Sequence, residues 1–275
     1  MLQDKQIAVL GAGRLGEALI RGLLARDAVS RARLRATVAG APRAEYLRQR
    51  YSIDAAAGSN AVAASDADVV IIAVKPGKVA SVLREIRAVL RPAQVIVSLA
   101  AAVRLRLMEA QLPASTPVVR AMPNIAMALG QSATALCPSA AVTDEQRALV
   151  ASVFRLVGEV EFVEEEALDG VTALAGSGPA FIFYLLEALA EGGRRAGVPG
   201  DVSDRLARQT LLGAARLALE TALTPGEWIE QVKTPGGTTV AGLAVLQREG
   251  VREALIEAVE AAARRATEIA DEFET

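Results

Sequence analysis

The sequence predicts an α/β domain with a doubly wound, mostly parallel sheet, followed by an all-α C-terminal domain. Two observations lead to this fold class. Up to about residue 163, short apolar runs alternate with amphipathic helical segments, a pattern typical of parallel strands joined by crossover helices. From residue 165 onward the pattern is almost entirely helical. We therefore expect one domain over 1–164 and a helical domain over 165–275.

The strands of the sheet are expected at 7–10, 34–38, 68–74, 94–97 and 117–120, with added strands at 134–136 and 159–163. Helices are expected at 79–90 and 144–156, and in the C-terminal domain at 179–196, 203–222, 225–232, 240–249 and 251–273. Several of the C-terminal helices carry Ala and Leu on more than one side. Such helices are deeply buried, which predicts that a subunit interface covers them.

A glycine turn follows the first strand directly and opens the first helix. Its residues are Gly11, Ala12, Gly13, Arg14, Leu15 and Gly16. In this pattern the first glycine makes the turn, the second lets the backbone approach a pyrophosphate, and the third lets helix and strand pack closely. The helix presents unpaired N–H groups and its positive dipole end to the anion. This order of elements predicts a Rossmann-like dinucleotide site rather than a purely structural turn.

The end of the second strand indicates which dinucleotide is bound. An Asp or Glu here would bind the 2′-hydroxyl of NAD, whereas this chain has Ala39 and Gly40, followed by Arg43. A small uncharged strand end with a nearby guanidinium suits a 2′-phosphate. We therefore expect NADPH or NADP as the cofactor, with NADH as a poorer substitute. The alternative is that Arg43 is only a solvated residue at a helix start.

The composition excludes several other functions. The 275 residues include 30 Lys and Arg and 32 Asp and Glu, so the net charge of −2 gives no reason to expect nucleic acid or a membrane as a partner. The absence of histidine excludes Ser-His and Cys-His hydrolase chemistry and the usual zinc sites, and no metal is expected. The single cysteine, Cys137, is expected in the core. One cysteine, no leader and no apolar run long enough to span a bilayer predict a cytoplasmic protein.

A second glycine-rich stretch, Lys-Thr-Pro-Gly-Gly-Thr-Thr, runs from Lys233 to Thr239 between two expected helices. Proline and paired glycines free the backbone for an unusual turn, and the next helix would present its first N–H groups to an anion. The loop is therefore either a ligand site or only a helix N-cap after a tight turn. A third helix entry, at 175–179, is most simply explained by close packing of backbones.

Taken in this order, the motifs resemble those of the pyrroline-5-carboxylate reductase family. The resemblance runs almost from end to end, and the late glycine–threonine loop is its most specific part. It is carried by the segments 11–16, 73–76, 120–124, 176–180, 209–210 and 234–239. The resemblance implies hydride transfer from NADPH to the C=N bond of L-1-pyrroline-5-carboxylate, which gives L-proline in the last step of proline biosynthesis.

The resemblance also implies roles for particular residues. Thr239 is expected to be the catalytic residue, and to hydrogen-bond the ring nitrogen so as to position it or relay a proton from water. The residues expected to hold the substrate carboxylate are Gly236, Gly237, Thr238 and Thr239. The residues expected to bind the cofactor are the six of the glycine turn, Arg43, Asn60, Ala73, Val74, Lys75, Pro76, Ala100, Ala101, Met122, Pro123 and Asn124.

Self-association is a further implication of the resemblance. The helical domain is expected to form an interlocked homodimer in which the substrate loop of one subunit meets the nicotinamide of its neighbour, and dimers are expected to assemble into a ring-like decamer. The departures from the family pattern are Phe181 for tyrosine, Ala175 for serine, Ala102 for glycine, and Ile125-Ala126 for Thr-Pro. These departures leave open a neighbouring cyclic imine, such as a piperideine carboxylate, as the substrate.

Two rival functions fit the sequence less well. A 3-hydroxyacid dehydrogenase typically needs a lysine base in its helical domain, and this chain has no lysine between Lys78 and Lys233. A regulator that senses the NADPH/NADP ratio without turnover would not need the Pro-Gly-Gly-Thr-Thr loop.

Overall fold

The computed structural model describes residues 2–25 and 27–273, which form two compact units. The first unit contains the chain up to Gly176 and the segment from Ala262 onward, and the second runs from Ser177 to Ala261. These units do not coincide with the predicted boundary at 164/165, because residues 165–176 and the end of the last helix make most of their contacts within the first unit. The boundary of the dimerising segment stays a prediction.

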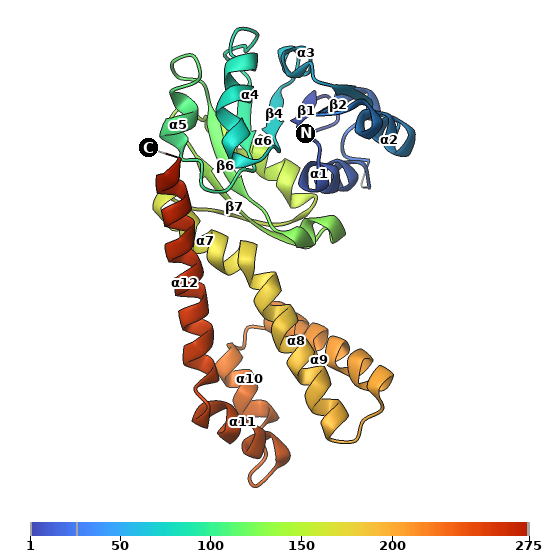
Figure 1. The fold of residues 1–275 in the computed structure, drawn as a ribbon, viewed down its shortest axis with the longest axis vertical. Helices are drawn as coiled ribbons and strands as arrows, with labels where there is room; N and C mark the ends of the chain where they lie inside the picture. Colours follow the sequence, from blue (N-terminus) through green and yellow to red (C-terminus); the bar gives the residue numbers. More distant parts are fainter. Residues whose placement is uncertain (1, 26, 274–275) are drawn as a thin grey trace. The chain divides into compact units, whose positions relative to one another are not determined.

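Within the described residues, the first unit contains an eight-stranded sheet with the order β3-β2-β1-β4-β5-β6-β7-β8 (Figure 1). All neighbouring strands are parallel except β6 and β7, so the predicted doubly wound, mostly parallel sheet is confirmed. The strands are β1 Ile7–Leu10, β2 Leu34–Val38, β3 Asp54–Ala57, β4 Val69–Ile72, β5 Val95–Ser98, β6 Val118–Met122, β7 Ser132–Pro138 and β8 Gly158–Phe162.

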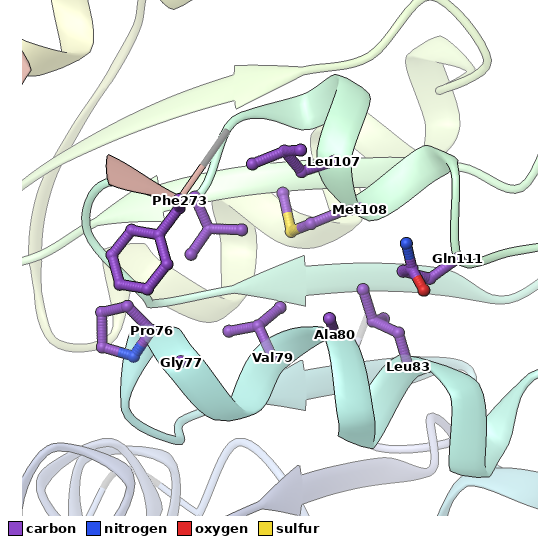
Figure 2. A pocket seen from close by; sticks show the side chains of 10 residues that line it. Pro76, Gly77, Val79, Ala80, Leu83, Leu107, Met108, Gln111 and Phe273 are labelled. Atoms are coloured by element: carbon purple, nitrogen blue, oxygen red, sulfur yellow. The ribbon is translucent and has the colours of Figure 1, made fainter. Parts of the chain in front are cut away.

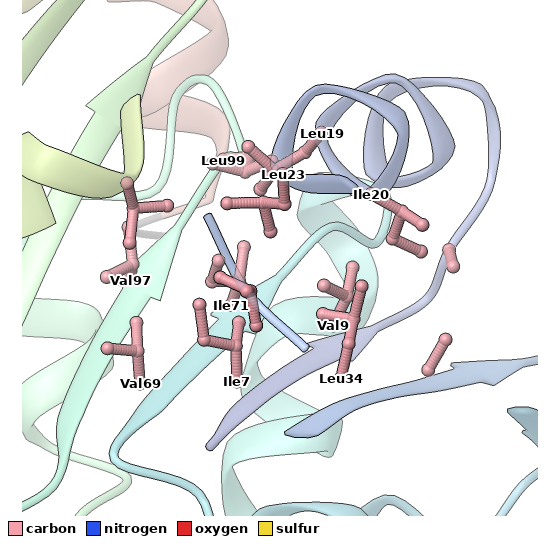
Figure 3. Close-up of a cluster of buried hydrophobic side chains, with 14 of the residues drawn as sticks. Ile7, Val9, Leu19, Ile20, Leu23, Leu34, Val69, Ile71, Val97 and Leu99 are labelled. Atoms are coloured by element: carbon pink, nitrogen blue, oxygen red, sulfur yellow. The ribbon is translucent and has the colours of Figure 1, made fainter. Parts of the chain in front are cut away.

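Helices cover both faces of this sheet because the central strands are apolar on both sides. In β1, Ile7 and Val9 pack with one group of helices, while Ala8 and Leu10 pack with the other. The first group is α1 Arg14–Ala25, α2 Ala41–Tyr51 and α6 Asp144–Arg155, and the second is α3 Asn60–Ser65, α4 Val79–Ile86 and α5 Leu105–Glu109. Figure 3 shows the first core, in which α1 places Leu19, Ile20 and Leu23 over the sheet.

The sequence prediction missed β3 and α3. The strand β3 is the run Asp-Ala-Ala-Ala, and alanine and aspartate are both depleted in strands. The helix α3 has only six residues, too few for a helical period to be visible. The predicted strand 68–74 is also shorter than expected, because the chain leaves the sheet after Ile72 and enters the 3₁₀ turn Pro76–Lys78.

The second unit is entirely helical in its described elements, as predicted. The π-helical turn Thr172–Ser177 follows α7 Leu168–Val171 and leads into α8 Gly178–Arg195. The remaining helices are α9 Gly200–Glu220, α10 Pro225–Val232, α11 Thr238–Arg248 and α12 Val251–Glu272, of which the last turns belong to the first unit. Large apolar side chains of this unit are exposed in the single chain, among them Phe183, Tyr184, Leu219 and Val232.

Candidate active site

The predicted cofactor residues all follow or end parallel strands, so they gather at the carboxyl edge of the sheet. The chain runs outward from β1 to β2 and β3, and then crosses back to β4 on the other side of β1. In such sheets, ligands bind outside the carboxyl ends of the strands at the point where the order reverses. The glycine turn follows β1 and the segment 73–76 follows β4, so both border this crevice.

Each glycine of the turn meets a different physical constraint. Gly11 has a φ of +83°, and a Cβ atom here would lie 2.3 Å from Cγ1 of Val74. Gly16 packs α1 against the sheet, since its Cβ would lie 3.1 Å from Cγ1 of Val9. Gly13 faces open space, because the nearest protein atom to an added Cβ is the Gly11 oxygen at 3.9 Å. This arrangement fits a pyrophosphate resting on the backbone at Gly13.

The end of β2 holds the glycine turn in place. The N–H groups of Gly11 and Ala12 donate to the Thr37 carbonyl at 2.9 and 2.8 Å. The Thr37 hydroxyl donates to Oδ1 of Asn60 at 2.5 Å, and Nδ2 of Asn60 donates to Glu85 at 2.8 Å. The predicted residue Asn60 is therefore linked to the glycine turn through the Thr37 side chain, whose hydroxyl also accepts the Gly11 N–H. Sequence reasoning missed Thr37 and Glu85, although a threonine within an apolar strand was an available signal.

Arg43, in the first turn of α2, lies against the same glycine turn. Its Nε and Nη2 atoms donate to the carbonyls of Ala12 and Gly13, each at 3.4 Å. The guanidinium also pairs with Glu17 of α1 and stacks on Tyr46, 4.9 Å from the ring centroid. Arg43 is thus a partly exposed residue with several contacts beside the glycine turn, and its contact with a 2′-phosphate stays a prediction.

The loops after β4 and β5 line the same edge. Lys75 is exposed, Ala100 is buried and Ala101 is half-buried. The next residue, Ala102, has a φ of +66°, in the left-handed region that favours glycine. The departure from glycine noted in the sequence therefore falls at a position where a side chain is strained.

The end of β6 packs against the π-helical turn. The Asn124 side chain accepts a hydrogen bond from the Ala126 N–H and donates to the Ala175 carbonyl, both at 3.1 Å. A Cβ atom on Gly176 would lie 2.7 Å from Cε of Met122. At the helix entry 175–179, Gly176 is therefore in close contact with a side chain rather than with backbone, whereas an added Cβ on Gly178 would meet nothing within 4 Å. The Asn124 side chain therefore joins the end of β6 to the π-helical turn, and its contact with the cofactor stays a prediction.

A small apolar pocket of about 200 Å³ adjoins this edge between α4 and α5 (Figure 2). Pro76 and Phe273 lie at one end of it and Gln111 lies at the other. No cationic side chain lines the pocket within the described residues, so it offers little to a phosphate. The open space at Gly13 is the better candidate for the dinucleotide.

A buried ion pair anchors the chain where it leaves the sheet. Arg120 of β6 is 5% exposed and donates from Nη1 to Oε1 of Glu165 at 2.7 Å, and the same oxygen accepts the Leu105 N–H at 2.7 Å. In the acidic triplet 164–166, which opens a 3₁₀ turn, Glu164 and Glu166 are exposed, whereas the middle residue, Glu165, partners a core arginine. An unpaired guanidinium in the core would cost several kcal/mol.

The buried cysteine of β7 behaves as predicted for a core residue. Cys137 is 3% exposed, and burial, with Glu165 nearby, raises the pKa of its thiol to about 11. A protonated thiol shielded from solvent is typical of a structural core cysteine.

The predicted substrate loop lies wholly in the second unit. Gly236 has a φ of +72°, and the Gly237 N–H donates to the Thr234 carbonyl at 2.8 Å, which closes the turn. The helix α11 begins at Thr238, so its first N–H groups lack partners within the helix. An apolar pocket of about 350 Å³ adjoins the loop, lined by Thr239 together with Ala214, Leu217, Trp228, Ile229, Val232 and Leu243. Free N–H groups beside an apolar pocket suit a small ring that carries a carboxylate.

The dinucleotide-type sheet edge and the separate helical unit define an NAD(P)-dependent oxidoreductase with a dimerisation domain. Two family models support this class. The family described as "NADP oxidoreductase coenzyme F420-dependent" matches residues 6–102, and "Pyrroline-5-carboxylate reductase dimerisation" matches residues 165–269.

Similar proteins of known name narrow the class to one family. The pyrroline-5-carboxylate reductase of Methanosarcina acetivorans is 36% identical over 98% of this chain and 99% of its own length. That of Pseudomonas aeruginosa is 37% identical over 99% of each. The solved pyrroline-5-carboxylate reductase of Coxiella burnetii has a TM-score of 0.91 at 34% identity, covering 96% of this chain and 98% of that one. The chain belongs to the pyrroline-5-carboxylate reductase family, which confirms the predicted resemblance, enzyme class and NAD(P) cofactor.

Proposed function

We propose that this protein reduces L-1-pyrroline-5-carboxylate to L-proline with NADPH. The observation that carries the proposal is 36–37% identity to pyrroline-5-carboxylate reductases across essentially the whole chain. The residues expected for the cofactor are grouped in the first unit and those expected for the substrate in the second. When bound, NADPH supplies the hydride, and the chain supplies binding, orientation and a proton path.

On the cofactor side, the first N–H groups of α1 and the open backbone at Gly13 would hold the pyrophosphate. Arg43 would face the 2′-phosphate from beside the same turn. Val74 would form a wall of the crevice, because its side chain already lies against Gly11. Gly13 fits a dinucleotide site because an added side chain there would contact no nearby protein atom and would instead fill the space proposed for the pyrophosphate.

On the substrate side, the N–H groups that open α11 would bind the carboxylate, and the apolar pocket beside Thr239 would take the ring methylenes. The C=N carbon is already electrophilic, so its reduction needs orientation and one proton, and neither a nucleophile nor a metal. As the carbon accepts the hydride, the C=N pair moves to nitrogen, which takes the proton. A threonine hydroxyl is a weak acid, so Thr239 would position the nitrogen or relay a proton from water.

The protein self-associates through its helical domain, as the family match over 165–269 shows. We propose an interlocked homodimer and its assembly into a decamer in the cytoplasm. The helix Glu165–Arg195 is long and apolar enough to cross a membrane by composition, with a mean hydropathy of 1.5. Because this helix falls within the dimerisation match, burial between subunits accounts for its apolar surface without a membrane.

A panel of substrates tests the proposal. NADPH oxidation is followed with pyrroline-5-carboxylate and with piperideine-6-carboxylate, and NADP reduction is followed with 3-hydroxyacids. We expect the five-membered imine to give the highest kcat/KM and the hydroxyacids to give no turnover. Faster reduction of the six-membered imine would reassign the substrate, and turnover of neither imine would remove the reductase function.

A further inference from the structure

Arg43 already has an anionic partner in the protein. Its Nη2 atom pairs with Oε2 of Glu17, one turn into α1. The other carboxylate oxygen of Glu17 accepts hydrogen bonds from the hydroxyls of Tyr46 at 3.0 Å and Tyr51 at 2.7 Å. The two oxygens of Glu17 therefore have different partners: Oε2 pairs with Arg43, and Oε1 accepts hydrogen bonds from Tyr46 and Tyr51 of α2.

We propose that Glu17 determines the dinucleotide specificity of this site by acting as an exchangeable partner of Arg43. When the dinucleotide lacks a 2′-phosphate, Glu17 keeps the guanidinium paired. When the phosphate is present, it replaces Glu17 on Arg43. This inference depends on the proposed cofactor site and adds a residue that neither the glycine pattern nor the strand end had indicated.

The Arg43–Glu17 ion pair makes the binding of NADH less unfavourable, because Arg43 keeps an anionic partner when no 2′-phosphate is present. The Arg43 side chain is 34% exposed and the Glu17 side chain 20%, so water screens the pair only in part. Without Glu17, a bound dinucleotide lacking the phosphate would leave a half-buried guanidinium with no anionic partner, in contact with two carbonyls at 3.4 Å and the ring of Tyr46. With Glu17 in place, the cation keeps a carboxylate partner.

The same carboxylate limits the preference for NADPH. Burial raises the pKa of Glu17, but hydrogen bonds from Arg43, Tyr51 and Tyr46 together hold it below its ordinary value. Glu17 is therefore an anion at neutral pH and repels a 2′-phosphate seated on Arg43. The two tyrosine hydroxyls keep Oε1 satisfied after the exchange, so releasing Arg43 does not leave an orphaned buried carboxylate.

The Glu17→Gln variant tests the exchange, because glutamine keeps the size and an acceptor for the tyrosines but removes the charge. Dissociation constants are measured by calorimetry for NADPH, NADH, adenosine 2′,5′-bisphosphate and 5′-AMP. We expect the preference for the 2′-phosphorylated member of each pair to rise about threefold to fivefold, the range expected for one partly screened charge pair. The matched control is Glu45→Gln, since Glu45 pairs with Arg48 on α2 and leaves Arg43 untouched.

A second variant separates exchange from simple repulsion. If Glu17 acts mainly through Arg43, the gain in preference shrinks to less than half when Glu17→Gln is made in an Arg43→Ala background. An unchanged or reduced preference in the single variant, or a full gain in the double variant, would overturn the proposal. Because dinucleotide binding is read directly, a lack of imine turnover would count against the proposed function alone.

Discussion

A methyl group at Gly13 should weaken cofactor binding without harming the fold. In the Gly13→Ala variant the new Cβ would meet no protein atom closer than 3.9 Å, and the φ of Gly13 lies outside the left-handed region. Gly13 is the N-cap of α1, since its carbonyl accepts the Glu17 N–H, and glycine is only modestly favoured over alanine at this position. We therefore expect the free energy of unfolding to fall by less than about 1 kcal/mol.

The same methyl group would occupy the space assigned to the pyrophosphate. Forcing extra volume into a well-packed contact costs about 1–3 kcal/mol, which corresponds to roughly a 5- to 150-fold rise in the Kd for NADPH. The comparison variant is Gly11→Ala, where the added Cβ lies 2.3 Å from Val74 and the φ is +83°. That change should lower the free energy of unfolding by about 2–4 kcal/mol, from backbone strain and overpacking together.

Calorimetric titration with NADPH and urea denaturation of both variants provide the measurement. Normal NADPH affinity in a folded Gly13→Ala protein would refute the placement of the pyrophosphate on this turn. Equal losses of stability in the two variants would refute the distinct roles assigned to Gly11 and Gly13.

Three further substitutions test other parts of the site. Thr239→Ala should lower kcat/KM for the imine about 100-fold while the Kd for NADPH stays within twofold, and Thr239→Ser should restore much of the activity; full activity in Thr239→Ala would remove the hydroxyl from the mechanism. Arg43→Ala should raise the Kd for NADPH about tenfold, through the loss of a charge-assisted contact, and change the Kd for NADH far less; equal effects on both would contradict contact with the 2′-phosphate. Ala102→Gly should raise the free energy of unfolding by about 0.5–1 kcal/mol, because the strain relieved at a φ of +66° exceeds the entropy that glycine adds to the unfolded chain. A loss of stability in urea denaturation would show that the position is not strained.

The sequence was sufficient to predict the alternating fold and the places of Gly11 in the turn and of Gly16 in the helix packing. Both follow from local patterns: apolar runs specify buried strands, and a strand–glycine–helix order allows few geometries. The strand β3 escaped prediction because its alanines form a strand only through pairing with β2, which is a tertiary effect. Element ends shifted for the same reason, as at Ile72, where the sheet ends before the apolar run does.

The side-chain networks around the site could not be predicted, because they join residues distant in the sequence. Thr37 links the glycine turn to Asn60 across 23 residues, and Glu165 reaches Arg120 across 45. The buried guanidinium of Arg120 requires an anionic partner, but the sequence does not show that Glu165 is that partner. No pattern in the sequence indicates which carboxylate meets which cation.

The surroundings of Thr239 bear on the source of the proton that the imine nitrogen takes up. Thr239 is half-buried, and the wall of its pocket is almost wholly apolar. No carboxylate or cationic side chain lines that pocket among the described residues, so the pocket itself provides no strong general acid. Water relayed by the hydroxyl, or protonation of the imine before it binds, is consistent with this surface, and both routes leave hydride transfer as the step that the protein organises.

The transfer of label from cofactor to product tests this account most directly. The enzyme is incubated with pyrroline-5-carboxylate and NADPH carrying deuterium at both C4 positions of the nicotinamide, and the product is analysed by mass spectrometry. The account predicts L-proline with one deuterium, located on C5, the former C=N carbon. Proline without deuterium, or deuterium on any other carbon, would contradict hydride transfer to the imine.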